Sequence, residues 1–240
     1  RDHTERMLSA FGARIEREGT KVTIEPADEL FAPEEIVVPG DISSAAYWLV
    51  AASLIEGSDI ILQDVGVNPT RTGILDVLSD MGANITIDNE RESGGEALAD
   101  IRVRAASLRG TSFGGEIIPR LIDEIPILAV AALFADGDTV ISGAAELRVK
   151  ETDRLAAVTT ELNRLAPGAV EAKEDGMVIH GGRMLSPASC RTYDDHRMAM
   201  SLAVAGAAGV GVTLDAPSCV NISYPSFYQT LDGLVQQGER

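Results

Sequence analysis

Three segments of the chain are apolar or small at nearly every position, and each is long enough to form a helix. They lie within 43–56, 125–135 and 196–208. A helix without a polar face is typically buried on every side. The alanines and glycines of these segments permit close approach between helices. We therefore expect three buried helices that pack together.

A second set of segments carries a clear polar face and alternates with the first. Amphipathic helices are expected at 71–81, 152–165 and 224–234, and the polar, Gly-rich stretch 89–96 is expected to be an exposed loop. Short β-branched runs predict strands at 59–62, 84–88, 100–104, 138–142 and 212–215, with two more before 181.

These elements recur in one order, which defines an internal repeat. Each copy has a buried helix, a Gly turn, a strand, an amphipathic helix and closing strands. The copies span about 40–107, 108–182 and 183–240, and the last lacks its closing strands. Units of this size cannot cover both faces of their own sheets. The prediction is an α/β fold of βαβαββ units around buried parallel helices.

The residues before the first full copy form an incomplete unit. Residues 7–24 mirror only the back half of a copy, and an acidic loop follows them up to Pro39-Gly40-Asp41. We therefore predict that 1–39 is the remnant of one lobe and that 40–240 is a second lobe. Because the chain starts without Met, we expect its numbering to begin inside a longer polypeptide.

The amino-acid composition and the net charge exclude some classes of binding partner. The chain has 45% hydrophobic and 24% charged residues, as soluble globular proteins do, and its net charge is −17. That charge argues against a nucleic acid or an anionic membrane as the main partner. Two cysteines make no disulfide framework, and no apolar run is long enough to span a bilayer. We expect a soluble protein of a reducing compartment, the cytoplasm.

The segment 146–154 (ELRVKETDR) places cations at the expected start of a helix. Lys150 precedes Arg154 by four positions and Glu151 precedes it by three, so one helical face would carry two cations beside a carboxylate. Free N–H groups of the first helical turn add positive potential. This pattern predicts an anion site. The alternative is a salt-bridged, solvated helix face.

The segment 193–200 (YDDHRMAM) has a cation in an unfavourable place. Asp194 or Asp195 can cap the buried helix that follows, which puts His196 and Arg197 in its first turn. A cation there opposes the helix dipole unless an anion is bound. The alternative is that Arg197 pairs with one of the two aspartates.

Asp123 and Glu124 precede the second all-apolar helix. Asp123 as a cap, with Pro126 in the first turn, is a sufficient structural explanation, and a general base is the functional one. All three segments occupy helix starts of the repeat. We therefore expect them to meet at one rim and to share a site.

Other chemistries find little support in the sequence. No segment fits a phosphate-binding loop of the Walker A type, a dinucleotide fingerprint or a Gly-x-Ser-x-Gly elbow. His3 and His180 have no second ligand at metal spacing. No metal or cofactor is expected.

Four phrases, together with their order, resemble the EPSP synthase (3-phosphoshikimate 1-carboxyvinyltransferase) family. The opening RDHTE at 1–5 resembles the bacterial glyphosate-tolerant class of that family. The phrases are GDISSAAYWLVAA at 40–52, LIDEIPILAVAALFADG at 121–137, ELRVKETDRL at 146–155 and TYDDHRMAMSLAVAG at 192–206. The resemblance implies the inside-out α/β barrel of enolpyruvyl transferases, with two lobes and an active site between them.

The implied reaction moves the enolpyruvyl group of phosphoenolpyruvate (PEP) to the 5-hydroxyl of shikimate 3-phosphate, in the shikimate pathway of aromatic amino acid biosynthesis. By match to the family's motifs, Asp123 would bind the shikimate hydroxyls and accept a proton. Lys150 would hydrogen-bond substrate and intermediate. Glu151 would move the proton to and from the PEP methylene. The reaction needs no metal or cofactor.

The resemblance also implies binding residues for both anions. Arg154 and Arg197 would clamp the PEP carboxylate, a bidentate task that suits guanidinium groups, and His196 would support them. Arg1 would contact the phosphate of shikimate 3-phosphate. Glu146, where some members have Asn, would help to place that phosphate.

The chain departs from the family pattern in two respects. Ile222 stands where some members have a Lys that reaches PEP, and the tolerant class commonly lacks that Lys too. The family's first half is absent, so we expect a fragment with half of the active site, inactive unless the missing N-terminal half is supplied. Glyphosate would be an inhibitor at the PEP position.

Two alternative functions remain open at this stage. One is the related enolpyruvyl transferase that acts on UDP-N-acetylglucosamine, which shares the fold and the repeat. The other is a non-catalytic repeat domain that binds a protein partner. Protection against thermal unfolding by PEP or shikimate 3-phosphate would favour an anion site over the second alternative.

Overall fold

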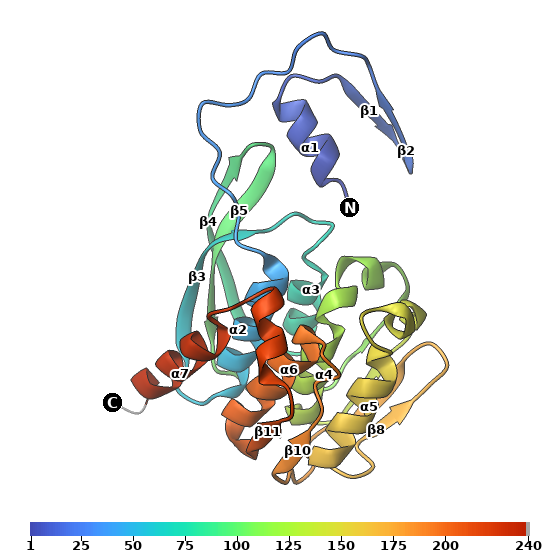
Figure 1. The fold of residues 1–240 in the computed structure, drawn as a ribbon, viewed down its shortest axis with the longest axis vertical. Helices are drawn as coiled ribbons and strands as arrows, with labels where there is room; N and C mark the ends of the chain where they lie inside the picture. Colours follow the sequence, from blue (N-terminus) through green and yellow to red (C-terminus); the bar gives the residue numbers. More distant parts are fainter. Residues whose placement is uncertain (239–240) are drawn as a thin grey trace.

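The structure is a computed structural model that describes residues 1–238. A small N-terminal part projects from a larger body (Figure 1). It contains α1 (His3–Ala10) and an antiparallel hairpin of β1 (Ile15–Glu18) and β2 (Lys21–Ile24). An extended segment then leads to Gly40, which pairs with Val65 of the body. Within the described residues, no helix is long and apolar enough to cross a membrane.

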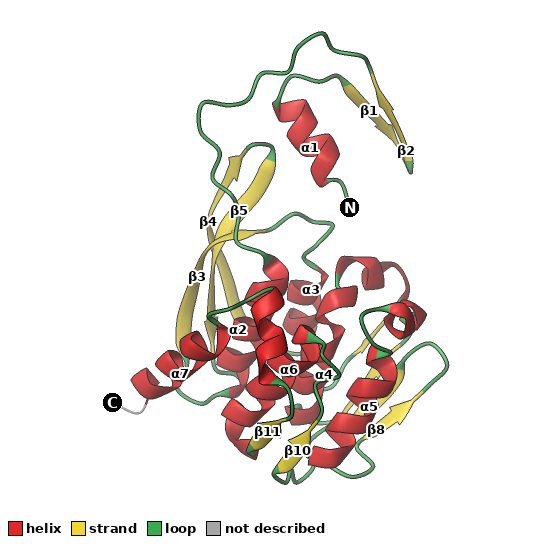
Figure 2. Cartoon of the chain, in the orientation of Figure 1, coloured by secondary structure: helices red, strands yellow, loops and turns green. Residues whose placement is uncertain are grey.

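Three helices form the centre of the body, as the apolar pattern predicts. They are α2 (Ile42–Leu54), α4 (Ile125–Phe134) and α6 (His196–Ala205). All three pack against one another. Nearly every residue of α4 is buried, from Ile125 to Leu133. Burial on all sides explains why these helices lack a polar face. Figure 2 shows this helical centre with strands around it.

The strands form separate sheets outside the central helices. Two of these sheets match the closing strands expected for the first two repeat copies, whereas the third has only two strands. The sheets are β3 (Asp59–Gly66), β5 (Glu96–Arg104) and β4 (Asn84–Ser93) in the order β3-β5-β4; β6 (Ser112–Phe113), β7 (Asp138–Ile141), β9 (Met177–His180) and β8 (Val170–Ala172) in the order β6-β7-β9-β8; and β10 (Ala188–Cys190) with β11 (Val212–Leu214).

Three amphipathic helices lie outside the central helices. They are α3 (Gly73–Asp80), α5 (Arg154–Leu165) and α7 (Phe227–Gly238). Short turns connect the elements. The turns are η1 (Gly115–Arg120), η2 (Ile122–Glu124), η3 (Ala145–Val149) and η5 (Pro217–Ile222), all 3-10 helical, and η4 (Gly206–Val210), a π-helical turn.

The prediction of an exposed loop at 89–96 is wrong. β4 continues to Ser93 and β5 begins at Glu96, so only Gly94 and Gly95 turn the chain. Both glycines have positive φ, at 58° and 85°. A side chain on Gly95 would also collide with the Arg6 carbonyl oxygen of α1. The glycines therefore permit a tight hairpin end that packs against the N-terminal part.

Several helix boundaries differ from the predicted ones. α5 begins at Arg154 instead of Thr152, because Asp153 caps it by accepting a hydrogen bond from the N–H of Ala156. α6 ends at Ala205 instead of Ala208, because the chain enters the π-helical turn, where Gly209 has a φ of 103°. α7 begins at Phe227, three positions after the predicted start.

Candidate active site

The three helix-start segments meet around the carboxylate of Asp123, as predicted. Asp123 lies 3.3 Å from Nη1 of Arg154 and 3.5 Å from Nζ of Lys150. Nη2 of Arg1 approaches its other oxygen at 3.6 Å. These cations come from the N-terminus, from the residue after η3 and from the first residue of α5. The fold thus gathers positive charge from distant parts of a chain whose net charge is −17.

Asp123 does not cap α4. Glu124 occupies the cap position, without a side-chain hydrogen bond to the helix, and Pro126 lies in the first turn. The structural interpretation of Asp123 is therefore wrong, and its carboxylate faces the cations. Burial raises the pKa of this carboxyl, but the fields of Arg197, Lys150 and the other two arginines outweigh burial and lower it. Asp123 is ionised at neutral pH.

Arg154 is the most enclosed cation of the cluster, with no exposed side-chain surface. Asp195 binds it bidentately, at 2.8 Å from Nε and 3.2 Å from Nη2. Glu151 contacts Nη2 at 2.6 Å. Carboxylates thus occupy the donors that were predicted to clamp a ligand.

Lys150 and Glu151 precede α5, which corrects the expectation that they share a helical face with Arg154. The residues before them form the separate turn η3. Lys150 reaches both Asp123 and, at 3.2 Å, Glu146, whose side chain is 67% exposed. Lys150 therefore lies in an irregular segment between the turn η3 and the helix α5.

Arg197 and His196 begin α6 and are partly buried. Asp195 caps the helix by accepting from the N–H groups of Arg197 and Met198 at 2.9 and 3.4 Å. Its carboxylate binds the guanidinium of Arg154 instead of that of Arg197. The alternative interpretation, in which Arg197 pairs with Asp194 or Asp195, is therefore wrong for the residues that the structure describes.

The environments of these two residues set their charges in opposite ways. Burial lowers the pKa of Arg197, but Tyr47, Asp123 and Glu124 outweigh burial and raise it. Burial and the neighbouring Arg197 lower the pKa of His196. At neutral pH Arg197 is a cation and His196 is a neutral hydrogen-bonding group.

An open pocket of about 560 Å³ lies on one side of Asp123. Arg1, Glu146 and Lys150 line it together with Arg120, Thr70 and parts of the η1 and η2 turns. Arg154, His196 and Arg197 do not line this pocket. Asp123 lines the pocket too, and it is close to two groups of cations, one on the pocket wall and one at the starts of α5 and α6.

Sequence reasoning named Glu124 beside Asp123 but did not predict that its carboxyl is buried. Glu124 is 1% exposed and accepts a hydrogen bond from the hydroxyl of Ser43, whose oxygen accepts from Nη2 of Arg71 at 2.8 Å. Burial raises the pKa of Glu124, against the effects of Ser43 and Arg197. Asp41 caps α2, as the sequence suggests. The burial of Glu124 could have been inferred from its position, because it directly precedes a helix that is apolar on every side.

The family model for EPSP synthase (3-phosphoshikimate 1-carboxyvinyltransferase) matches residues 1–231. This chain belongs to the EPSP synthase family. The 3-phosphoshikimate 1-carboxyvinyltransferase of Desulforudis audaxviator is 57% identical over 235 residues, which are 98% of this chain and 54% of that protein. The one of Gloeobacter violaceus is 55% identical over 99% of this chain and 55% of its own length.

Solved structures agree with this assignment. EPSP synthase from Acinetobacter baumannii superposes with a TM-score of 0.90 at 39% identity, over 99% of this chain and 54% of that one. The enolpyruvyl transferase NikO from Streptomyces tendae has a TM-score of 0.70 at 21% identity, over 95% and 51%, and shows the fold alone. The family has an α/β enolpyruvyl transferase fold. The chain spans about half the length of the curated relatives it matches.

Proposed function

We propose that this chain supplies one part of the active site that transfers the enolpyruvyl group of PEP to the 5-hydroxyl of shikimate 3-phosphate, with release of phosphate. The observation that carries the proposal is the cluster of Arg1, Lys150, Arg154 and Arg197 around Asp123. Both substrates are anions. The relatives named 3-phosphoshikimate 1-carboxyvinyltransferase support this reaction over the one with UDP-N-acetylglucosamine.

Asp123 is the proposed proton acceptor. Its lowered pKa makes it a weak base while no substrate anion lies against the cations around it. Two bound anions would offset those cations and raise its proton affinity. Asp123 would then become a competent base only when both substrates are present.

The proposed addition step joins the 5-hydroxyl oxygen to C2 of PEP. The hydroxyl proton goes to Asp123, and Glu151 gives a proton to the methylene carbon. Elimination then returns a proton of the resulting methyl group to Glu151 as the bond between C2 and the phosphate oxygen breaks, and the proton on Asp123 leaves with the phosphate. Lys150, close to Asp123 and Glu146, is placed to hydrogen-bond the substrate and the intermediate.

The two groups of cations close to Asp123 suggest two anion positions. We assign the pocket with Arg1, Glu146 and Lys150 to shikimate 3-phosphate. Arg197 and Arg154, supported by His196, are assigned to the carboxylate of PEP. Glyphosate would compete at the PEP position, and membership of the glyphosate-tolerant class stays a prediction.

The rest of the enzyme is the proposed partner of this chain. The N-terminal part exposes apolar side chains, with Phe31 at 69% and Val38 at 82% exposure. The β10–β11 sheet has two strands where the second sheet has four. Such surfaces and sheet edges favour coverage by further protein.

We also propose a cytoplasmic location, because Cys190 and Cys219 are free thiols.

A chimera tests the function. In it, this chain replaces the matching 54% of the Desulforudis audaxviator enzyme. We expect phosphate release that requires both PEP and shikimate 3-phosphate. Asp123→Asn should lower kcat by roughly 100-fold or more, the scale of general base catalysis.

Asp88→Asn in β4, an exposed position, is the matched control and should leave kcat unchanged. A folded chimera without phosphate release would overturn the proposal and favour a non-catalytic role. Full turnover by Asp123→Asn would overturn the role of Asp123 alone.

A further inference from the structure

The turn before α6 has an unusual backbone. Tyr193 and Asp194 both lie in the left-handed region, with φ of 58° and 55°. Two consecutive residues other than glycine in this region are disfavoured, because their side chains crowd the backbone. Such a turn persists only where its surroundings hold it. It leads directly into Asp195, His196 and Arg197.

Helix α5 holds this turn at two points. Arg154 and Glu161 lie two helical turns apart on one face of α5, and both are fully buried. Arg154 binds the carboxylate of Asp195 at the end of the turn. Glu161 binds its beginning, where it accepts from the hydroxyl of Tyr193 at 2.8 Å and from the N–H of Arg191 at 3.0 Å.

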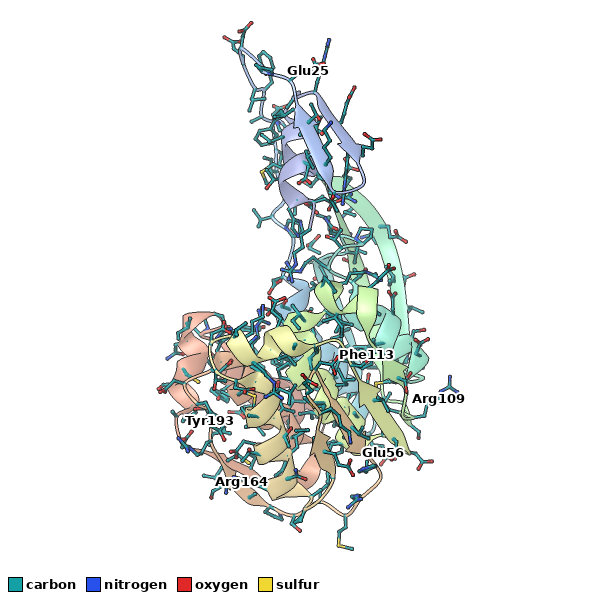
Figure 3. All side chains as sticks on the ribbon, turned by 90° about the vertical axis from the view of Figure 1, so that its right-hand side faces the viewer. Glu25, Glu56, Arg109, Phe113, Arg164 and Tyr193 are labelled. Carbon is teal, nitrogen blue, oxygen red and sulfur yellow. The ribbon has the colours of Figure 1, made fainter. Side chains whose placement is uncertain are left out.

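Two arginines make further contacts at the beginning of the turn. Nε of Arg164 lies 2.9 Å from Oε2 of Glu161, so the buried carboxylate is paired with a cation. The Arg191 guanidinium lies over the Tyr193 ring, 5.0 Å from its centre. Figure 3 shows the labelled Tyr193 and Arg164 on the same side of the body. The hydroxyl of Tyr193 is therefore part of a network with Glu161 and Arg164.

We infer that Glu161 and Tyr193 are positioning residues that hold the left-handed turn and so fix Arg197 and His196 for the anion. The inference rests on the proposed function. Neither residue contacts Asp123 or lines the pocket beside it. They act through Asp195, which caps α6 and binds Arg154 with the same carboxylate. A shift of the turn would move the start of α6 and the guanidinium of Arg154 together.

Tyr193→Phe in the chimera tests this inference. The change removes one hydrogen bond to a charged group and keeps the aromatic ring. A bond of that kind has a strength equivalent to about tenfold in an equilibrium constant. We expect a KM for PEP that is roughly tenfold higher, with a smaller change in kcat and in the KM for shikimate 3-phosphate. Hydrogen–deuterium exchange of the amides of 195–198 should accelerate, while exchange in α4 stays unchanged.

Tyr228→Phe is the matched control. Its hydroxyl is buried on α7 and has no hydrogen-bond partner among the described residues. This variant should change neither the KM for PEP nor the exchange at 195–198. Glu161→Gln removes the charge of the acceptor, although its amide oxygen still accepts from the Tyr193 hydroxyl, so it should raise the KM for PEP by less than Tyr193→Phe does. The double variant should be little worse than Tyr193→Phe alone, because both changes act on the same bond.

The readouts separate the two proposals. Faster exchange at 195–198 in a chimera without turnover would support the positioning network and overturn the proposed function. An active chimera in which Tyr193→Phe changes neither the KM for PEP nor the exchange would overturn the inference. Equal loss of exchange protection in α4 and at 195–198 would also overturn it, because the effect would then be a general loss of stability.

Discussion

Two adjacent acids in η2 have pKa values that are shifted in opposite directions, because their side chains lie in different surroundings. Asp123 points toward the cations, which lower its pKa, whereas Glu124 points toward α2, where burial raises its pKa. The two residues are consecutive in the same 3-10 turn. A single turn thus places an ionised carboxylate in the site and a carboxyl of raised pKa in the protein interior.

Glu124→Gln should test the state of the buried acid. A raised pKa in the folded state means that this group favours folding at low pH and that the gain is lost as pH rises through the folded pKa. Gln cannot ionise. The variant should therefore become more stable relative to the parent chain as pH rises from 5 to 8, measured by urea unfolding at each pH. A stability difference that is the same at both pH values would contradict a raised pKa.

At the scale of elements, the starts of α4, α5 and α6 build the site, and packing between helices contributes stability. α7 packs on α2 through an aromatic cluster. Phe227 is fully buried and stacks on Trp48 at 5.1 Å, with Tyr47 and Tyr224 each at 5.7 Å. This cluster fastens the last helix to the first central helix, far from Asp123 in sequence.

Phe227→Ala should destabilise the chain by about 3–5 kcal/mol, the usual cost of removing a buried phenyl ring. Urea unfolding measures the change. Met184→Ala is the control, because Met184 is 91% exposed and should change the free energy of unfolding little. A loss below about 1 kcal/mol for Phe227→Ala would show that α7 is not part of the cooperative core.

Helices with a strong hydrophobic pattern could be predicted from the sequence, but contacts between side chains distant in sequence could not. The all-apolar runs predicted α2, α4 and α6, and helix starts predicted the meeting of Asp123, Lys150 and Arg154. Nothing local in the sequence indicated that Asp195 would bind Arg154, 41 positions away. The same holds for Glu161 and Tyr193, because only tertiary packing brings them together.

At the scale of the whole molecule, an acidic protein gathers four cations around one carboxylate, Asp123. The net charge of −17 repels anions at long range, so the cluster around Asp123 must act at short range. The N-terminal part exposes apolar residues and the third sheet has two strands, and these are the surfaces that the proposed partner would cover. The central claim is that this chain carries one part of a divided active site.

The most direct test mixes this chain with the separately produced remainder of the Desulforudis audaxviator enzyme and measures phosphate release from PEP and shikimate 3-phosphate. We expect no turnover from either part alone and turnover from the mixture, lost with Glu151→Ala in this chain. Gel filtration would establish that the two parts associate. A complex without turnover, or turnover by this chain alone, would contradict the claim.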